Sequence, residues 1–284
     1  MPLLRMDLLL REARDRHCAV AAFECWDSSS VQAIALAAQR TGQPVIFQAS
    51  PTEYTYCGGP AALKAMVDWY VDQTGITGAL HLDHGSTLNQ VAECLRGGFT
   101  SVMLDASRHP YEENVRLTRE TVALAREYEA GVEAELGHVL GLEGDLEEVP
   151  GSEAAQTDPD QAAEFIAETG ADCLAVAIGT IHGVYRGKPE INLARLAQIA
   201  ARVSVPLVLH GGSGTPDDLI RASIRGGIAK INICTELQQA WLAGIEETLK
   251  VNSISVPGKF YTLPRERLIE RMVGKINLFA EGGA

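Results

Sequence analysis

The sequence predicts a (β/α)₈ barrel, the TIM-barrel class of α/β folds, as a single domain over residues 1–284 with a C-terminal helical extension. Two observations predict it: eight short apolar runs rich in Val, Ile and Leu recur along the chain, and a helical pattern accompanies each run. Eight alternations of strand and helix are the pattern of a closed barrel. A doubly wound open sheet is the alternative. No Gly-x-Gly-x-x-Gly follows a predicted strand, which disfavours a dinucleotide-binding fold.

The predicted strands are mostly apolar without a break, as expected for parallel strands that are buried on both faces. In chain order they are residues 17–25, 44–50, 78–83, 101–105, 131–137, 173–179, 206–212 and 228–234. The helical patterns are residues 29–40, 59–73, 86–98, 111–130, 158–170, 192–203, 215–227 and 235–250. The last two helices carry start signals. Thr215 and Thr235 are predicted N-caps, because Asp218 and Gln238 follow three residues later and can reach back.

Composition and charge exclude several kinds of partner. The formal net charge is −13 and the 24 basic residues form no long run, so neither nucleic acid nor an anionic membrane is expected as a partner. No apolar run approaches the roughly 18 residues of a membrane span, and the N-terminus lacks the uninterrupted apolar core of a signal peptide. The six cysteines form no Cys-x-x-Cys pair, which indicates reduced thiols in a cytoplasmic protein.

Polar or ionisable side chains follow almost every predicted strand, although core packing does not require them. In a barrel of this class the chemistry lies at the carboxyl ends of the strands. The residues at or near these ends are Glu24, Gln48, Asp83, His84, Asp105, Glu133, Glu135, His182, His210 and Asn232. Their shared position predicts an active site at this end of the barrel.

Three of the seven histidines, His84, His182 and His210, come at or just after three different strands. Three protein nitrogens that leave one position open are the ligand set of a catalytic zinc ion. One such histidine alone would be interpreted as a polar loop residue, but three at equivalent heights favour a metal site. His81 shares a strand face with the neighbouring aspartate and is predicted to support the site without binding the metal. His17 is expected to cap the barrel floor.

The segment HGGSGTPDD (residues 210–218) has the character of an anion-binding loop. Its glycines let backbone N–H groups approach an anion, and the helix that follows adds partial positive charge at its N-terminus. Asn232 and Thr235 precede or begin the next helix, and barrels of this class frequently bind phosphate between the loops after strands seven and eight. An ordinary glycine turn is the alternative, but the two segments together predict a phosphate site.

Five segments of the chain occur together in a known family. They are LHLDHG (80–85), VEAELGHVLGLEGD (132–145), LAVAIGTIHGVY (174–185), PLVLHGGSG (206–214) and KINICTEL (230–237). Together they resemble the class II, zinc-dependent ketose-bisphosphate aldolases, with the tagatose-bisphosphate and related ketose-phosphate aldolases as the nearest members. The resemblance extends over nearly the whole chain and is weakest before residue 75 and after residue 250.

The resemblance implies the reversible cleavage of a ketose 1-phosphate or ketose 1,6-bisphosphate, of the tagatose or fructose type, to dihydroxyacetone phosphate and an aldehyde. It implies zinc on the three histidines, Asp83 as the acid–base residue at the C4 hydroxyl, and Glu143 as the loop residue that moves a proton on the ketone fragment. The residues implied to hold dihydroxyacetone phosphate are Gly183, Gly211, Gly212, Ser213, Asn232, Ile233, Cys234 and Thr235.

The resemblance has three further implications. Asp105 and Glu135 match positions that can hold a second, non-catalytic cation. A monovalent cation, Na⁺ or K⁺, is expected near the phosphate. The protein is expected to be a homo-oligomer, either a dimer or a tetramer.

The chemistry suits these residues independently of the resemblance. Retro-aldol cleavage needs a base for a hydroxyl proton and an electron sink for the enediolate, and a zinc ion is a suitable sink. The other aldolase mechanism uses a lysine Schiff base. Lys230 is the only lysine within a predicted strand, and it lies deeper along that strand than Asn232, which disfavours this mechanism.

The chain departs from the family's pattern in the segments that face the aldehyde half of the substrate. Where the family usually has asparagines after the first strand, this chain has Glu24 and Asp27. Leu263 stands where bisphosphate enzymes of this class place a phosphate-binding arginine, although the same segment offers Lys259, Arg265 and Arg267. Carboxylates accept hydrogen bonds from hydroxyl groups and repel phosphate. We therefore expect a ketose 1-phosphate to be cleaved at least as well as the matching 1,6-bisphosphate.

Two other functions compete with this interpretation. One is a sugar-phosphate-binding barrel without activity, or a non-catalytic partner subunit of an aldolase. Such a protein would have no reason to keep Asp83, Glu143 and the three histidines together. The other is a different zinc barrel, such as a hydrolase, which would need a water-activating carboxylate and no phosphate loop.

Overall fold

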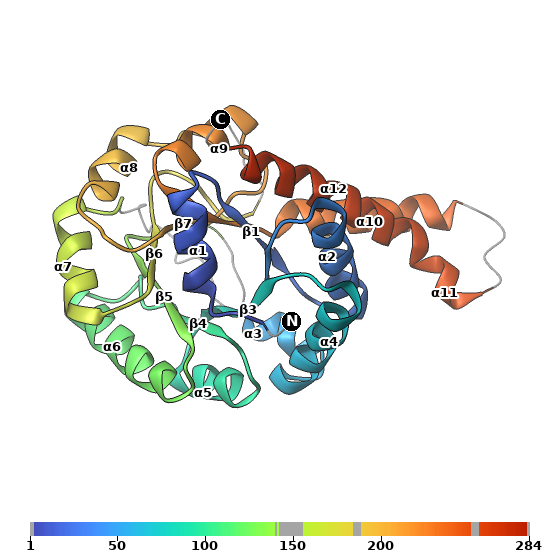
Figure 1. Cartoon of the computed structure of the whole chain (residues 1–284), viewed down its shortest axis with the longest axis horizontal. Coiled ribbons are helices and arrows are strands. Elements are labelled where there is room, and N and C mark those ends of the chain that lie inside the picture. Colours follow the sequence, from blue (N-terminus) through green and yellow to red (C-terminus); the bar gives the residue numbers. More distant parts are fainter. Residues whose placement is uncertain (1–2, 140, 142–155, 184–188, 251–255, 283–284) are drawn as a thin grey trace.

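The computed structural model describes residues 3–139, 141, 156–183, 189–250 and 256–282. Eight parallel strands close into a barrel in which each strand pairs with its neighbours in the chain and β8 pairs with β1 (Figure 1). The strands are β1 Val20–Glu24, β2 Val45–Ala49, β3 Gly78–Gly85, β4 Ser101–Leu104, β5 Gly131–Leu136, β6 Cys173–Val176, β7 Leu207–Leu209 and β8 Ile228–Ile233. The predicted barrel is therefore confirmed.

Helices form the outer ring of the barrel (Figure 1). They are α2 Ser28–Thr41, α3 Pro51–Tyr56, α4 Pro60–Thr74, α5 Leu88–Arg96, α6 Tyr111–Glu127, α7 Pro159–Thr169, α8 Leu193–Ala200, α9 Asp217–Arg225 and α10 Thr235–Leu249. The predicted C-terminal extension consists of α11 Pro257–Phe260 and the long α12 Thr262–Ala280. Two helices were not predicted: α3, and α1 Met6–Asp15 before the first strand. Within the described ranges, no helix combines the length and the apolar character needed to cross a membrane.

α1 crosses the amino ends of the strands and lies over the centre of the barrel in Figure 1. Its buried side chains Met6, Leu9 and Leu10 form one apolar cluster with inward-facing strand residues such as Val20 and Ile46. Burial of each large apolar side chain contributes about 1.5–3 kcal/mol. The barrel interior is therefore apolar near the amino ends of the strands, and the polar interior residues lie toward the carboxyl ends of the strands.

His17 follows α1 and does not cap the floor as predicted. It is exposed and has a φ of +53°, in the left-handed region. The N–H groups of His17 and Cys18 donate to the carbonyl groups of Arg14 and Ala13 at 3.0 and 2.9 Å, the hydrogen-bond pattern of a helix end with a left-handed residue. The first strand consequently begins at Val20 and not at residue 17.

The predicted N-caps of the last two barrel helices are wrong. The N-cap of α9 is Pro216 and that of α10 is Cys234, and neither makes a side-chain cap. The hydroxyl of Thr215 instead donates to the carbonyl oxygen of Gly211 at 3.5 Å, so it is held within the loop. At the start of α10 the N–H groups of Cys234 and Glu236 donate to the hydroxyl of Ser213, and not to the side chain of Thr235.

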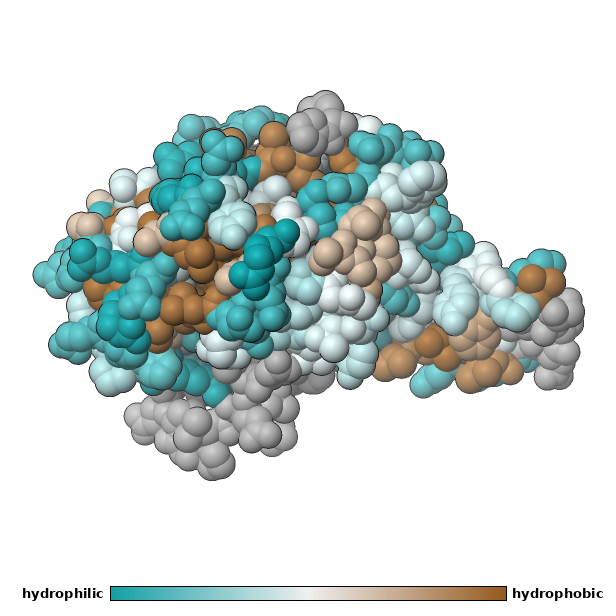
Figure 2. Space-filling model, turned by 90° about the horizontal axis from the view of Figure 1, so that it is seen from below, coloured by the Kyte–Doolittle hydropathy of each residue, from teal (hydrophilic) through white to brown (hydrophobic). Residues whose placement is uncertain are grey.

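α11 and the adjoining ends of α10 and α12 form an arm that extends away from the barrel (Figure 1). α12 packs along α10 and also contacts α2. The approach of α10 to α12 is so close that a Cβ atom on Gly244 would lie 2.5 Å from Cα of Pro264. The space-filling view shows apolar surface on this arm (Figure 2), whose exposed large apolar residues are Leu242, Leu249, Val256 and Tyr261.

Candidate active site

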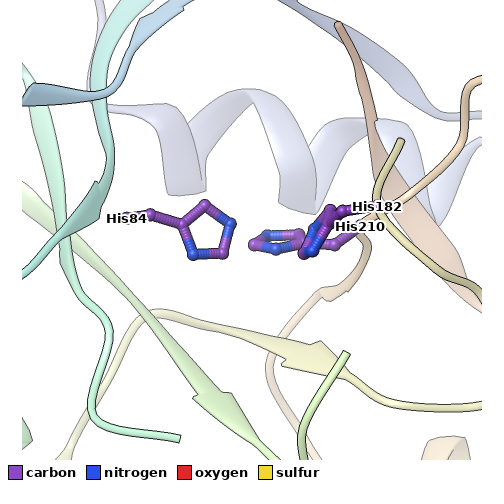
Figure 3. A group of neighbouring side chains, drawn as sticks. All are labelled: His84, His182 and His210. Carbon is purple, nitrogen blue, oxygen red and sulfur yellow. The ribbon is translucent and has the colours of Figure 1, made fainter. Parts of the chain in front are cut away.

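Three imidazole rings meet at the carboxyl ends of the strands. His84 lies on β3, His182 follows β6 and His210 follows β7. One nitrogen from each ring lies within 4.8 Å of the others, a spacing that can hold a metal ion. Figure 3 shows the ring of His84 facing those of His182 and His210. The structure therefore brings together the three histidines that the sequence singled out.

An irregularity in β3 allows two consecutive residues to face the site. Neighbouring side chains of a regular strand point to opposite faces. The pairing of β3 with β4 shifts register between Leu82 and Gly85, and His84 has a φ of +45°. A bulge of this kind re-aims side chains, and a left-handed non-glycine residue costs on the order of 1–3 kcal/mol. The result is that Asp83 and His84 both contribute to the same site.

Acidic side chains orient two of the three rings. Nδ1 of His84 lies 2.9 Å from Oδ2 of Asp105, and Nε2 of His210 lies 2.7 Å from Oε1 of Glu133. Such partners fix the orientation of metal-binding imidazoles. With its Nε2 held by Glu133, His210 has a buried Nδ1 that makes no hydrogen bond within the described part of the chain. That nitrogen is available as a ligand.

Asp105 and Glu135 form a second group with His84, whose ligand atoms also lie within 4.8 Å of one another. Burial raises the pKa of Glu135 to about 7, and the negative charge of Asp105 adds to this effect. Burial would also raise the pKa of Asp105, but its hydrogen bond to His84 holds that pKa well below its usual range. The geometry suits the predicted second cation, which stays a prediction.

Asp83 is fully buried, and two side-chain amides hold its carboxylate. Gln48 Nε2 donates to Oδ2 at 3.0 Å, and Asn232 Nδ2 lies 3.2 Å from both oxygens. His81 lies nearby, with Nδ1 2.8 Å from Ser101 Oγ and Nε2 3.7 Å from Asp83 Oδ1. This position agrees with the predicted supporting role of His81.

Lys230 is buried below Asp83, and its Nζ lies 2.8 Å from Oε2 of Glu133. Burial alone would lower the pKa of this lysine, but the charges of Glu133 and Asp83 raise it above its ordinary value. Burial would likewise raise the pKa of Glu133, but Lys230 and His210 hold it well below its usual range. An ammonium group in such an ion pair is not a nucleophile, which counts against the Schiff-base mechanism.

A cavity of about 230 Å³ adjoins His182. Its lining residues are Glu24, Ser50, Glu53, His182, Gly183, Gly211, Ser213, Asn232, Cys234, Thr235 and Gln238. Most of the predicted phosphate-binding residues therefore share one cavity with a predicted metal ligand. Ile233 differs, because its side chain packs in the apolar core and only its backbone can reach a ligand.

The loop after β7 requires glycine where it approaches the rest of the site. Gly211 has a φ of +65°, and a Cβ atom there would lie 2.3 Å from the carbonyl oxygen of Ile181. The hydroxyl of Ser213 accepts hydrogen bonds from the N–H groups of Cys234 at 3.2 Å and Glu236 at 3.4 Å. The loop after β7 is thereby joined to the N-terminus of α10, where an anion is favoured.

The two acids after the first strand have different positions. Glu24 is buried and lines the cavity, with its carboxylate accepting from Gln48 Nε2 at 3.0 Å and from the N–H of Ser50 at 2.8 Å. Asp27 instead caps α2, because its Oδ1 accepts from the N–H of Ser30 at 2.8 Å. The expectation that both acids face the substrate is therefore wrong for Asp27.

The basic residues of the C-terminal segment lie away from the cavity. Arg265 donates to Oε1 of Gln32 at 2.8 Å, and Arg267 pairs with Glu247 at 2.9 Å. Among the residues that the structure describes, no lysine or arginine lines the cavity. Glu143, the predicted proton carrier, lies outside the described residues.

Sequence reasoning missed Ser50, Glu53 and Gln238, which also line the cavity. Ser50 and Glu53 hydrogen-bond to each other at the start of α3. The Ser-Pro step at residues 50–51 signals a helix start, since proline favours the first helical position. Gln238 was interpreted as a helix-capping residue and was therefore not considered as a residue of the site.

Known proteins resemble the chain over its whole length. A family model described as "Fructose-bisphosphate aldolase class-II" matches residues 4–284. The chain is 39% identical over 282 residues to a probable fructose-bisphosphate aldolase of Bacillus subtilis (strain 168), with 98% of each chain covered. It is 38% identical over 286 residues to a 6-phospho-5-dehydro-2-deoxy-D-gluconate aldolase of Halalkalibacterium halodurans, with 100% and 98% covered. Among solved structures, the YdjI aldolase from Escherichia coli K12 aligns with a TM-score of 0.87 at 34% identity, with 99% of each chain covered.

Proposed function

The chain belongs to the class II fructose-bisphosphate aldolase family and is a lyase of that class, and from this premise we propose its substrate and the residues that act on it. The proposed substrate is a ketose 1-phosphate or ketose 1,6-bisphosphate of the tagatose or fructose type. The products are dihydroxyacetone phosphate and an aldehyde. The observation that carries the proposal is the cavity that joins His182, the loops after β7 and β8, and the carboxylate of Glu24.

Membership of the family implies zinc, and the residues of the site fit it. The nitrogens of His84, His182 and His210 lie within one ligand set. The buried Nδ1 of His210 makes no hydrogen bond in the described part of the chain, although Oε2 of Glu135 lies 3.4 Å away. When bound there, zinc supplies a Lewis acid that polarises the ketone oxygen and stabilises the enediolate. A monovalent cation beside the phosphate stays a prediction.

Asp83 is proposed to take the proton from the C4 hydroxyl. As that O–H bond breaks, the C4–O bond becomes the aldehyde carbonyl and the C3–C4 bond breaks. Its electron pair stays on the ketone fragment as the enediolate. The amides of Gln48 and Asn232 hold the carboxylate of Asp83 in place for this step. Glu143 is proposed to return a proton to the ketone fragment.

The phosphate of the ketone fragment is proposed to lie between the loops after β7 and β8. Gly211, Ser213 and Thr235 line the cavity there, next to the N-terminus of α10. Backbone N–H groups and the helix dipole favour an anion in this position. This support compensates for the absence of lysine and arginine from the cavity lining in the described part of the chain.

At the aldehyde end, Glu24 supports a substrate without a distal phosphate. A buried carboxylate accepts hydrogen bonds from hydroxyl groups and repels phosphate. Relatives of nearly equal identity are named for different substrates, fructose bisphosphate in one case and a gluconate with a single phospho group in another. Overall similarity therefore leaves the distal group undetermined, and we propose that a ketose 1-phosphate is accepted at least as well as the bisphosphate.

The proposal is tested by zinc analysis of the purified protein, combined with detection of dihydroxyacetone phosphate from a panel of ketose 1-phosphates and bisphosphates. We expect one catalytic zinc per chain and release of the triose phosphate. Binding of sugar phosphate without release would favour a non-catalytic partner subunit instead.

We further propose that the protein is a cytoplasmic homo-oligomer, either a dimer or a tetramer. The exposed Leu242 and Leu249 on the arm support association with another copy. All six cysteines are free, which agrees with a reducing compartment. Light scattering of the purified protein measures the oligomeric state directly.

A further inference from the structure

The ammonium group of Lys230 lies between two buried carboxylates that belong to different strands. Its Nζ is 2.8 Å from Oε2 of Glu133 on β5 and 4.0 Å from Oδ1 of Asp83 on β3. All three side chains are fully buried. Nε2 of His81 lies 3.7 Å from an oxygen of each carboxylate.

These groups have the arrangement of a cation site. The ligand atoms of His81, Asp83 and Glu133 lie within 4.8 Å of one another, as those of the three metal-site histidines do. Two carboxylates buried together need a positive charge, because a buried unpaired carboxylate is costly. Lys230 supplies that charge from within the chain.

We infer that Lys230 is a positioning residue, whose ammonium group fills the cation position formed by His81, Asp83 and Glu133 and so fixes both carboxylates. The inference rests on the proposed role of Asp83 as proton acceptor. It adds a connection between the two halves of the site, because the same ammonium contacts Glu133, which orients His210.

The contacts explain how one charge serves both carboxylates. Glu133 uses Oε1 for His210 and Oε2 for Lys230, so its two oxygens are divided between the metal ligand and the lysine. Asp83 receives amide hydrogen bonds from Gln48 and Asn232, both neutral. Lys230 thus balances the negative charge of Asp83, while the amides of Gln48 and Asn232 set the orientation of the Asp83 carboxylate.

The test is Lys230→Met, which keeps most of the volume and removes the charge. We expect kcat for cleavage to fall about 100-fold, because a misplaced reacting group typically costs about that factor, while KM changes less than about threefold. Stability should fall as well, since Asp83 and Glu133 lose their counter-charge. Retention of kcat within about threefold would overturn the inference.

The double variant Lys230→Met/Glu133→Gln separates positioning from a merely structural role. Neutralising both members of the ion pair should restore the melting temperature toward that of the wild type, because it leaves one fewer buried charge unpaired. Glu133 also orients His210, so the double variant is compared with Glu133→Gln alone. We expect its kcat to stay about 100-fold below that of Glu133→Gln, because Asp83 still lacks its cation. A kcat equal to that of Glu133→Gln, together with recovered stability, would mean that Lys230 only supports the fold. If Lys230→Met does not fold, this comparison carries the test.

Arg5→Met is the matched control. The guanidinium of Arg5 also pairs with two buried carboxylates, Asp7 at 2.9 Å and Asp172 at 3.1 Å, but it lies beside α1 at the amino ends of the strands and does not line the cavity. It should lose stability and keep kcat within about twofold. A wild-type protein without aldolase activity would refute the proposed function, whereas an active wild type with an equally active Lys230→Met would refute only the role of Lys230.

Discussion

The side-chain amide of Gln48 donates a hydrogen bond of 3.0 Å to the carboxylate of Asp83. The same nitrogen also lies 3.0 Å from Oε2 of Glu24. One amide group therefore joins the proposed proton acceptor to the carboxylate at the proposed aldehyde end. Because both carboxylates are buried and like charges repel, a shared donor stabilises their approach.

Replacing Gln48 with leucine should misplace Asp83 without disturbing the metal ligands. Leucine has a similar size and no donor, so both carboxylates lose a hydrogen bond. We expect kcat to fall about 10- to 100-fold, in the range of a misplaced general base, with zinc content unchanged. The matched control is Gln39→Leu, because the amide of Gln39 is exposed and donates to the carbonyl of Thr74, far from the site. An equal loss of kcat in both variants would contradict the role given to Gln48.

Glu24→Asn should shift the substrate preference toward the bisphosphate. Removing the carboxylate removes its repulsion of a distal phosphate, and about 1.4 kcal/mol of repulsion corresponds to a factor of ten. We therefore expect the ratio of kcat/KM for bisphosphate over 1-phosphate to rise about tenfold or more. Steady-state kinetics with both substrates measures this ratio.

Asp27→Ala provides the control for charge near the first strand. Asp27 caps α2 and does not line the cavity, so the substrate ratio should stay at the wild-type value. Loss of the cap should lower stability by about 1 kcal/mol. If Asp27→Ala moves the ratio as far as Glu24→Asn does, the cavity is not what selects the substrate.

Removal of the metal should abolish cleavage. Chelation takes away the electrophile that stabilises the enediolate, and several kcal/mol of stabilisation correspond to about a thousandfold in rate or more. Addition of zinc or cobalt should restore activity. Full activity in a protein shown by elemental analysis to be free of metal would contradict the three-histidine site.

The arm depends on a close approach of two helices at Gly244. In an open helix, alanine would be favoured over glycine by about 1 kcal/mol. At Gly244 the added Cβ would meet backbone Cα of Pro264 at 2.5 Å, and overpacking of this kind costs about 1–3 kcal/mol. Gly244→Ala should therefore lower the melting temperature. Gly274→Ala on α12 meets no atom within 4 Å and should raise it slightly. Equal changes in melting temperature in the two variants would show that α10 and α12 can move apart at little cost.

The repeated pattern of strands and helices was enough to predict the barrel, and the polar strand ends were enough to locate the site. His84, His182 and His210 lie at or just after the ends of three strands, and closure of the barrel brings them together. The sequence did not reveal that Asp83 and His84 both face inward, because alternation along a strand allows only one of two neighbours to do so. The register shift in β3 resolves this conflict.

Local signals and long-range pairs account for what was missed. Because of its charge, Asp27 was interpreted as a residue that faces the substrate. Ser30, three residues later, instead completes a helix-capping pair with it. The ion pair of Lys230 with Glu133 joins residues 97 positions apart, and only the closed barrel places them side by side. That residues 1–284 form one domain stays a prediction from length and pattern.

The central claim is that a zinc-dependent aldolase of this family accepts a ketose 1-phosphate at a site whose distal end is acidic. The measurement that tests it most directly is the ratio of kcat/KM for a ketose 1-phosphate and the matching 1,6-bisphosphate, followed by release of dihydroxyacetone phosphate with the zinc-loaded wild type. We expect the 1-phosphate to be cleaved at least as well as the bisphosphate, and both activities to disappear on chelation. A strong preference for the bisphosphate, unchanged in Glu24→Asn, would show that Glu24 does not face the distal end and would contradict the account.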